Sequence, residues 1–154
     1  MRLIRNFYCN ETNKAWLLFL PFLLGYTVFI LVFIPNRNIL DEGRYLMFAN
    51  NLLNGFYSPP PPDINLWNGP GYPLLMAILL FFKLPILGIR LFNGVLLYLS
   101  LILTFKTINT YASRKEALFF TVLLGLYYPI YPKISLVLTE AFAWFLISLI
   151  GYLF

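Results

Sequence analysis

The chain contains no histidine, one cysteine and only six acidic residues among its 154 residues. Without histidine it lacks the side chain that most often serves as an acid, a base or a metal ligand near neutral pH. With Cys9 alone, neither an intramolecular disulfide nor a cysteine cluster for a metal ion can form. Carboxylates are the main side chains left for acid–base chemistry. The sequence predicts no cofactor, although the composition alone does not exclude a divalent metal ion.

Charge of both signs is also scarce, since 11% of the residues are charged and 60% are hydrophobic. A soluble domain carries about 25% charged residues. The composition therefore predicts an all-α integral membrane protein with the lipid bilayer as a partner. The net charge of +5 does not indicate a nucleic-acid partner, because the basic residues lie at the ends of apolar runs, as in membrane proteins.

Four apolar segments are predicted to cross the bilayer as helices, at about 15–34, 86–105, 116–131 and 136–154. The apolar segment Pro73–Leu84 would be about 18 Å long as a helix, against about 30 Å of hydrocarbon. It is therefore expected to be re-entrant or interfacial. Residues 1–154 are predicted to form the N-terminal part of one polytopic membrane domain, with residues 36–85 as an external loop.

The basic residues predict the orientation. Arg2 and Arg5 precede the first apolar segment, and the short loop 106–115 is rich in Lys and Arg, so both are expected on the cytoplasmic side. The external loop then faces the extracytoplasmic side of the plasma membrane, or of the endoplasmic reticulum in a eukaryote. Because the chain stops at Phe154 inside an apolar run, we expect a truncated frame or a portion of a longer protein.

Two of the six acidic residues, Asp41 and Glu42, are adjacent in the external loop. They open the stretch 41–54, which Gly55 is expected to end. Apolar residues recur within it at helical spacing: Tyr45, Phe48, Leu52 and Leu53. An amphipathic helix lying flat in the membrane interface is predicted.

The acid pair has two interpretations. As a helix cap, Asp41 would accept a hydrogen bond from the backbone N–H of Gly43 or Arg44, and Glu42 would suit the positive end of the helix dipole. As a functional group, a carboxylate at the membrane surface accepts a proton from a hydroxyl nucleophile. The residues alone leave both interpretations open.

The order of motifs resembles that of a known enzyme superfamily. The motifs are Asp41-Glu42-Gly43-Arg44-Tyr45, Leu52-Leu53-Asn54-Gly55, Gly69-Pro70-Gly71-Tyr72-Pro73-Leu74-Leu75, Arg90-Leu91-Phe92-Asn93 and Thr139-Glu140. Together they resemble the N-terminal third of GT-C glycosyltransferases. More narrowly, they are similar to the branch with the dolichyl-phosphate-mannose protein mannosyltransferases and the bacterial aminoarabinose transferases of lipid A.

The resemblance implies a membrane glycosyltransferase that moves a sugar from a polyprenyl-phosphate donor to a protein, lipid or glycan acceptor on the outer membrane face, with inversion. Asp41 matches the catalytic base, and Glu42 matches the second acid of the mannosyltransferase-like members. Related oligosaccharyltransferases resemble this architecture but hold a divalent ion with an Asp-x-Asp pattern. Position 43 is glycine here, so no metal is expected to be required. These 154 residues alone are expected to be inactive.

The departing lipid phosphate needs positive charge, and Arg44, Arg90 and Lys133 all lie near the predicted outer face. The alternative role of each of these cations is to anchor the chain at the lipid headgroups. Glu140 begins the last apolar run, where it is expected either to face the substrate cavity or to pair with Lys133. These four residues are the predicted substrate-binding set.

A non-enzymatic polytopic membrane protein, such as a transporter fragment or an accessory subunit, is the alternative. A transporter is expected to place polar residues at the middle of the bilayer in broken helices. The acid pair of this chain lies instead at the predicted membrane surface, and this difference favours the enzyme.

Overall fold

The computed structural model describes residues 14–34, 41–64, 66 and 68–154, and every regular element in that part of the chain is a helix. The all-helical fold class is thus confirmed for these residues. The predictions made for Arg2 and Arg5, and for residues 36–40 of the external loop, lie outside the described residues.

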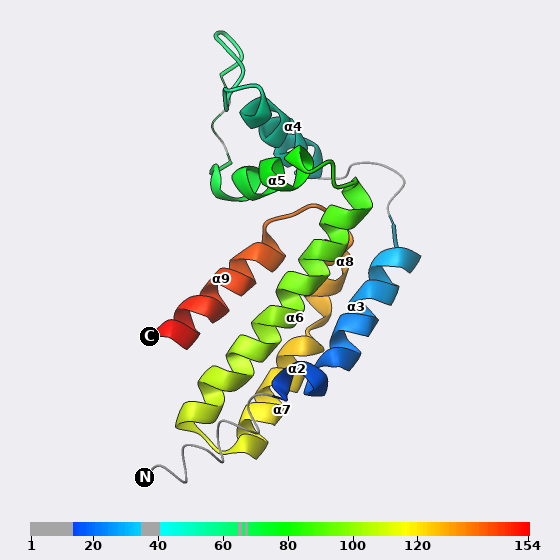
Figure 1. Ribbon diagram of the computed structural model, residues 1–154, viewed down its shortest axis with the longest axis vertical. Coiled ribbons are helices and arrows are strands. Elements are labelled where there is room, and N and C mark those ends of the chain that lie inside the picture. Colours follow the sequence, from blue (N-terminus) through cyan, green and yellow to red (C-terminus); the bar gives the residue numbers. More distant parts are fainter. Residues whose placement is uncertain (1–13, 35–40, 65, 67) are drawn as a thin grey trace.

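Most helices run alongside one another in one bundle (Figure 1). Its long members are α3 (Leu20–Val32), α6 (Ile86–Tyr111), α7 (Arg114–Gly125) and α9 (Glu140–Leu153). Three short helices complete it: α2 (Ala15–Leu18), η1 (Tyr128–Ile130) and α8 (Tyr131–Ile134). Helix α6 is central, because it contacts α2, α3, α7, α8 and α9.

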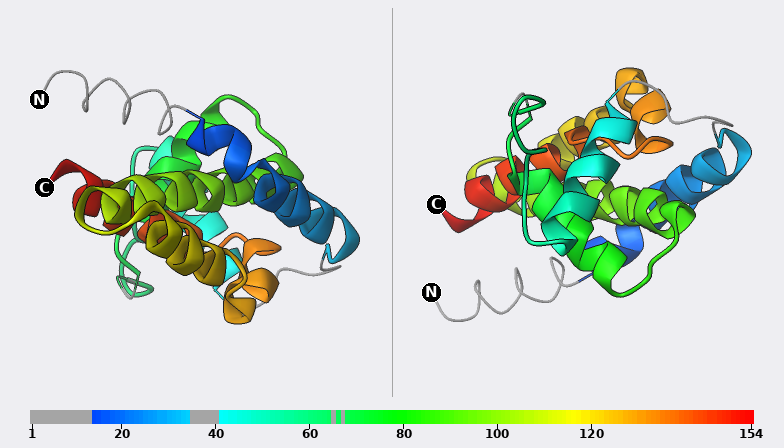
Figure 2. Two further views of the ribbon diagram at one scale, coloured as in Figure 1. Left: turned by 90° about the horizontal axis from the view of Figure 1, so that it is seen from below. Right: turned by 90° about the horizontal axis from the view of Figure 1, so that it is seen from above.

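The two remaining helices, α4 (Glu42–Leu53) and α5 (Gly71–Phe81), pack on each other and lie across one end of the bundle (Figures 1 and 2). We call α4, α5 and the connection between them the cap. The connection between α6 and α7 lies at the opposite end of the bundle. The segment 135–139, between α8 and α9, passes beneath the cap.

Helix α4 begins and ends within one residue of its predicted limits. Gly55, just beyond its end, has φ of +87°, a left-handed conformation that glycine adopts without strain. The apolar stripe of α4 differs from its prediction, however. Of its four predicted members, Tyr45 and Phe48 are buried inside the protein, Leu52 is half-buried and Leu53 is exposed; Ala49 is buried beside the first two. The apolar helix α5 covers Tyr45 and Ala49, with the rings of Tyr45 and Tyr72 5.4 Å apart, whereas the Phe48 ring stacks on Tyr57 of the connection between the two helices.

Among the described residues, one helix is long and apolar enough to cross a membrane, the 26-residue α6. The number rises to two if α7 and the stretch Tyr128–Ile134, bent by 42°, form one broken span. Helices α3, α5 and α9 are apolar but shorter. Four membrane-crossing helices therefore stay a prediction.

The helix boundaries differ from the predicted spans where local capping intervenes. Helix α6 continues to Tyr111, beyond the predicted limit of residue 105, and only residues 112 and 113 separate it from α7. A capping box starts α7: the backbone N–H of Glu116 donates to Ser113 Oγ at 3.4 Å, and the Ser113 N–H donates to Glu116 Oε2 at 2.8 Å. Later in the chain α9 begins at Glu140, four residues after the predicted start.

The end of α7 approaches α3 so closely that a side chain at position 125 would require Phe22 to move. The Gly125 carbonyl accepts hydrogen bonds from the hydroxyls of Tyr26 at 3.1 Å and Tyr131 at 2.9 Å. A Cβ atom at this position would lie 2.4 Å from the ring of Phe22. The close approach brings α3, α7 and α8 together around one backbone carbonyl.

We expect Gly125→Ala to destabilise the bundle by about 1–3 kcal/mol, because the new methyl group forces the Phe22 ring out of its place. Thermal unfolding of the purified protein in detergent measures the effect. Gly25→Ala in α3 is the matched control, since nothing lies within 4 Å of its added Cβ. Equal melting temperatures for the two variants would contradict the prediction.

Candidate functional site

The helical register of α4 separates the two adjacent acids. Glu42, Tyr45 and Ala49 follow one another at intervals of three and four residues, which places them on one face of the helix. Glu42 therefore joins the buried stripe, and its side chain is 0% exposed. Asp41 precedes the first helical residue, and its side chain is 43% exposed.

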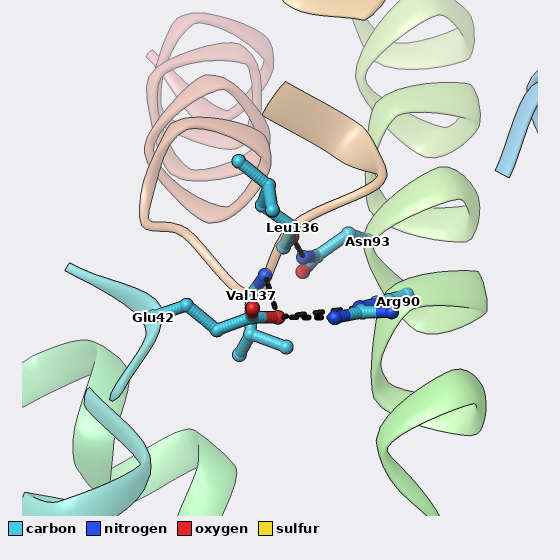
Figure 3. Close-up of polar contacts among 5 residues, drawn as sticks. All are labelled: Glu42, Arg90, Asn93, Leu136 and Val137. Carbon is cyan, nitrogen blue, oxygen red and sulfur yellow. Dashed lines mark hydrogen bonds and ion pairs between the residues drawn. The ribbon is translucent and has the colours of Figure 1, made fainter. Parts of the chain in front are cut away.

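The buried Glu42 carboxylate joins three parts of the chain (Figure 3). Its Oε1 atom accepts hydrogen bonds from Arg90 Nη2 at 2.9 Å and Nε at 3.2 Å. The backbone N–H of Val137 donates to the same oxygen at 2.9 Å. Arg90 belongs to α6 and is itself buried. Cap, central helix and the segment 135–139 thus meet at one carboxylate.

A second polar contact runs beside the first. Asn93, one turn along α6 from Arg90, donates from Nδ2 to the Leu136 carbonyl at 3.1 Å (Figure 3). Its Oδ1 atom accepts from the Tyr72 hydroxyl of α5 at 3.2 Å. We use the name polar seam for both sets of contacts: those of Glu42 with Arg90 and Val137, and those of Asn93 with Leu136 and Tyr72.

The Tyr72 hydroxyl, which donates to Asn93, lies in an environment that opposes its ionisation. Burial raises the pKa of Tyr72, and the negative charges of Glu42 and Glu140 add to that rise. The protonated hydroxyl is thus available to Asn93.

Asp41 occupies the N-cap position of α4, but its side chain makes no hydrogen bond to the helix backbone. Its carboxylate pairs instead with Arg44, whose side chain is similarly exposed. Exposed pairs of this kind contribute about 0–1 kcal/mol. Little free energy is therefore lost when either side chain takes another partner.

Lys133 and Glu140 form the third ion pair, with Nζ and Oε1 2.6 Å apart. This contact agrees with the alternative in which Glu140 pairs with Lys133. Both side chains keep part of their surface exposed.

The six predicted site residues thus fall into three ion pairs, one buried and two accessible. The sequence did not predict the roles of Tyr72, Asn93 or the Val137 backbone. Asn93 had a detectable signal, since Arg90, Asn93 and Leu97 recur at helical spacing on the buried face of α6. Within the described residues, no group of three or more acidic or cysteine side chains is placed to hold a metal ion.

Comparison of the chain with protein-family models, with well-characterised proteins and with solved structures finds no match. Its function is therefore inferred from the residues of the site. The site offers a half-exposed carboxylate at Asp41, an adjacent cation at Arg44, and a buried polar seam that holds the neighbouring backbone.

Proposed function

We propose that the protein is a membrane glycosyltransferase that moves a sugar from a polyprenyl-phosphate donor to an acceptor hydroxyl, with Asp41 as the general base. The observation that supports this is the contrast between two adjacent carboxylates. Asp41 stays accessible at the start of α4, whereas Glu42 is withdrawn into the polar seam. Helix α6, long and apolar enough to cross a membrane, supports a reaction at the membrane surface.

In the proposed reaction Asp41 accepts the proton of the acceptor hydroxyl while the hydroxyl oxygen attacks the anomeric carbon. The new carbon–oxygen bond forms opposite the phosphate, and the bond from the anomeric carbon to the phosphate oxygen breaks, so the configuration inverts. The transition state is oxocarbenium-like. The polyprenyl phosphate leaves with its charge and needs little proton donation, so one base suffices. The proton on Asp41 then passes to water.

Arg44 suits the departing phosphate because its present partner is the base itself. When Asp41 takes up the proton its negative charge is lost, and the pair with Arg44 weakens as charge develops on the phosphate. Lys133, whose side chain is accessible in its pair with Glu140, is the second candidate for the phosphate. Position 43 is glycine, so the proposal includes no metal held by an Asp-x-Asp pattern.

The proposed membrane arrangement places α3, α6, the bent α7–α8 stretch and α9 across the bilayer and the cap on the extracytoplasmic side. Arg114 and Lys115 are exposed at the end of the bundle opposite the cap. Basic residues in short loops favour the cytoplasmic side, which supports the cap facing outward. The acceptor is a protein, lipid or glycan with a hydroxyl group.

Cysteine labelling tests this orientation in cells. Asp63→Cys in the cap and Lys115→Cys at the opposite end are made separately in a Cys9→Ser background, and both positions are exposed. A membrane-impermeant maleimide is expected to label position 63 on intact cells and position 115 only after permeabilisation. The reverse pattern would place Asp41 in the wrong leaflet for a lipid-linked donor and would overturn the proposal.

Sugar transfer is then measured with membranes that contain the protein expressed from its full natural reading frame. A radiolabelled sugar on polyprenyl phosphate is expected to reach the acceptor fraction, whereas the same sugar on a nucleotide is not. Correct orientation without transfer from any lipid-linked sugar would favour the non-enzymatic alternative.

A further inference from the structure

We propose that Glu42 and Arg90 are positioning residues. Together with the backbone N–H of Val137 they form a clamp that fixes the cap, and with it the Asp41 carboxylate, on the end of the bundle. Neither side chain touches the reacting atoms. The role of Asp41 rests on the proposed function, whereas the clamp stands on the contacts themselves.

The environment of Glu42 opposes a role as a second catalytic acid. A general acid or base must lie within hydrogen-bond reach of the proton that it transfers. The Glu42 side chain is 0% exposed, and its Oε1 atom already accepts from Arg90 and Val137. A substrate hydroxyl reaches it only if the cap leaves the bundle.

Arg90 is equally unsuited to a lipid phosphate. Its Nε and Nη2 atoms both donate to Glu42, and the residue is buried beneath the cap. Binding a phosphate would strip Glu42 of its counter-charge inside the protein. An uncompensated buried charge is strongly unfavourable, so Arg90 remains with the carboxylate.

The clamp connects segments that lie far apart in the sequence. Arg90 is 48 residues and Val137 95 residues from Glu42. The Tyr72–Asn93–Leu136 contacts add a second attachment, from α5 to the same face of α6 and to the adjacent peptide unit. Two attachment points restrict both the position and the rotation of the cap.

The clamp acts on Asp41 through the backbone. Glu42 is the first residue of α4, and Asp41 is joined to it by one peptide bond. Fixing the Glu42 side chain therefore fixes the direction in which the helix starts and the place of the preceding carboxylate. A displacement of about 1 Å in a reacting group lowers a rate by roughly 100-fold.

A double-mutant cycle tests the clamp: Glu42→Gln, Arg90→Gln and the double variant. Each single variant leaves one buried charge without its partner, whereas the double variant leaves two neutral amides that hydrogen-bond to each other. Limited trypsin digestion of the full chain in detergent follows cleavage after Arg44, within the cap. Cleavage after Lys106, a half-buried residue inside α6, requires that helix to unwind and so reports global unfolding.

Each single variant is expected to raise the cleavage rate after Arg44 on the order of 100-fold, with little change after Lys106. In the folded fraction the kcat for sugar transfer falls and the KM for the donor stays within about 2-fold, since only the position of the base changes. The double variant is expected to return the cleavage rate after Arg44 and the kcat to within about tenfold of wild type, because neutral replacement of a buried ion pair is tolerated. Asp63→Asn, which neutralises an exposed acid of the same cap, is expected to change neither rate.

Single variants that unfold throughout, with cleavage after both Arg44 and Lys106, still support the clamp if the double variant folds. Single variants with wild-type cleavage and wild-type transfer would overturn it. A double variant that regains protection yet remains as inactive as Glu42→Gln would place Glu42 at the reacting atoms and overturn the positioning role. If wild-type protein transfers no sugar, the proposed function fails, and the cleavage rates alone decide the clamp.

Discussion

Asp41→Asn is expected to lower sugar transfer by about 100- to 10,000-fold, the range over which a positioned general base accelerates proton transfer. Asparagine has nearly the size of aspartate but cannot take up the acceptor proton. The substitution removes only the exposed pair with Arg44, because Asp41 makes no capping hydrogen bond. Stability should therefore change by less than about 1 kcal/mol. The rate of transfer from a radiolabelled polyprenyl-phosphate sugar is the measurement.

Asp63→Asn is the matched control, since Asp63 is an exposed acid of the same cap with the same change of charge. Its transfer rate should equal that of wild type. Unchanged transfer by Asp41→Asn, at wild-type protein levels, would remove Asp41 from the role of base. A loss of folded protein in place of a loss of rate would show that the residue serves stability.

Phe48→Ala is expected to destabilise the cap by about 3–5 kcal/mol, because it empties a fully buried position. Phe48 is 0% exposed, and its ring stacks on Tyr57 with centroids 4.7 Å apart. Tyr57 belongs to the connection between α4 and α5, where its carbonyl accepts from Asn51 Nδ2 at 3.0 Å. Loss of the Phe48 ring therefore loosens the connection as well as the helix.

Hydrogen exchange of the α4 amides measures this destabilisation. Phe81→Ala at the end of α5 is the control, because that ring is 70% exposed and its removal should change stability by about 0.5 kcal/mol or less. Similar exchange rates in the two variants would contradict the assigned burial of Phe48.

Helix α4 was predictable from the sequence because its determinants are local. Apolar spacing from Tyr45 onward and a glycine at position 55 are sufficient to define its length. The surroundings of its stripe were not predictable in the same way. A membrane interface and a second apolar helix both cover apolar side chains, and spacing alone does not distinguish them.

The connection between α6 and α7 is shorter than the predicted loop 106–115, because hydropathy does not locate the ends of a helix. Lys106 indicated the end of a span, yet the helix continues to Tyr111. Ser113 and Glu116 have the spacing of a capping box, which marks the start of α7. Helix ends follow the capping residues here, whereas hydropathy indicates only the apolar middle.

The site was predictable in part. Asp41 and Glu42 stand out in the sequence as adjacent acids. Glu42 precedes Tyr45 by three residues and therefore shares its helix face, so the sequence pattern already indicated that Glu42 is buried and Asp41 is not. The partners of Glu42 could not be found in this way. Nothing in the sequence distinguishes Arg90 from other cations near helix ends. The Val137 contact uses a backbone N–H, which every residue except proline has, so the sequence does not indicate it.

The long separation between Glu42 and Val137 has a consequence for biosynthesis. A ribosome adds about 5–20 residues per second, so the amide that completes the contact is made about 5–20 s after the carboxylate. The counter-charge, Arg90, is added about halfway through that interval, 48 residues after Glu42, whereas the amide donor Val137 comes 95 residues after it. Assembly of this end of the molecule is therefore a late event, because the last partner of the carboxylate is made only when translation reaches residue 137.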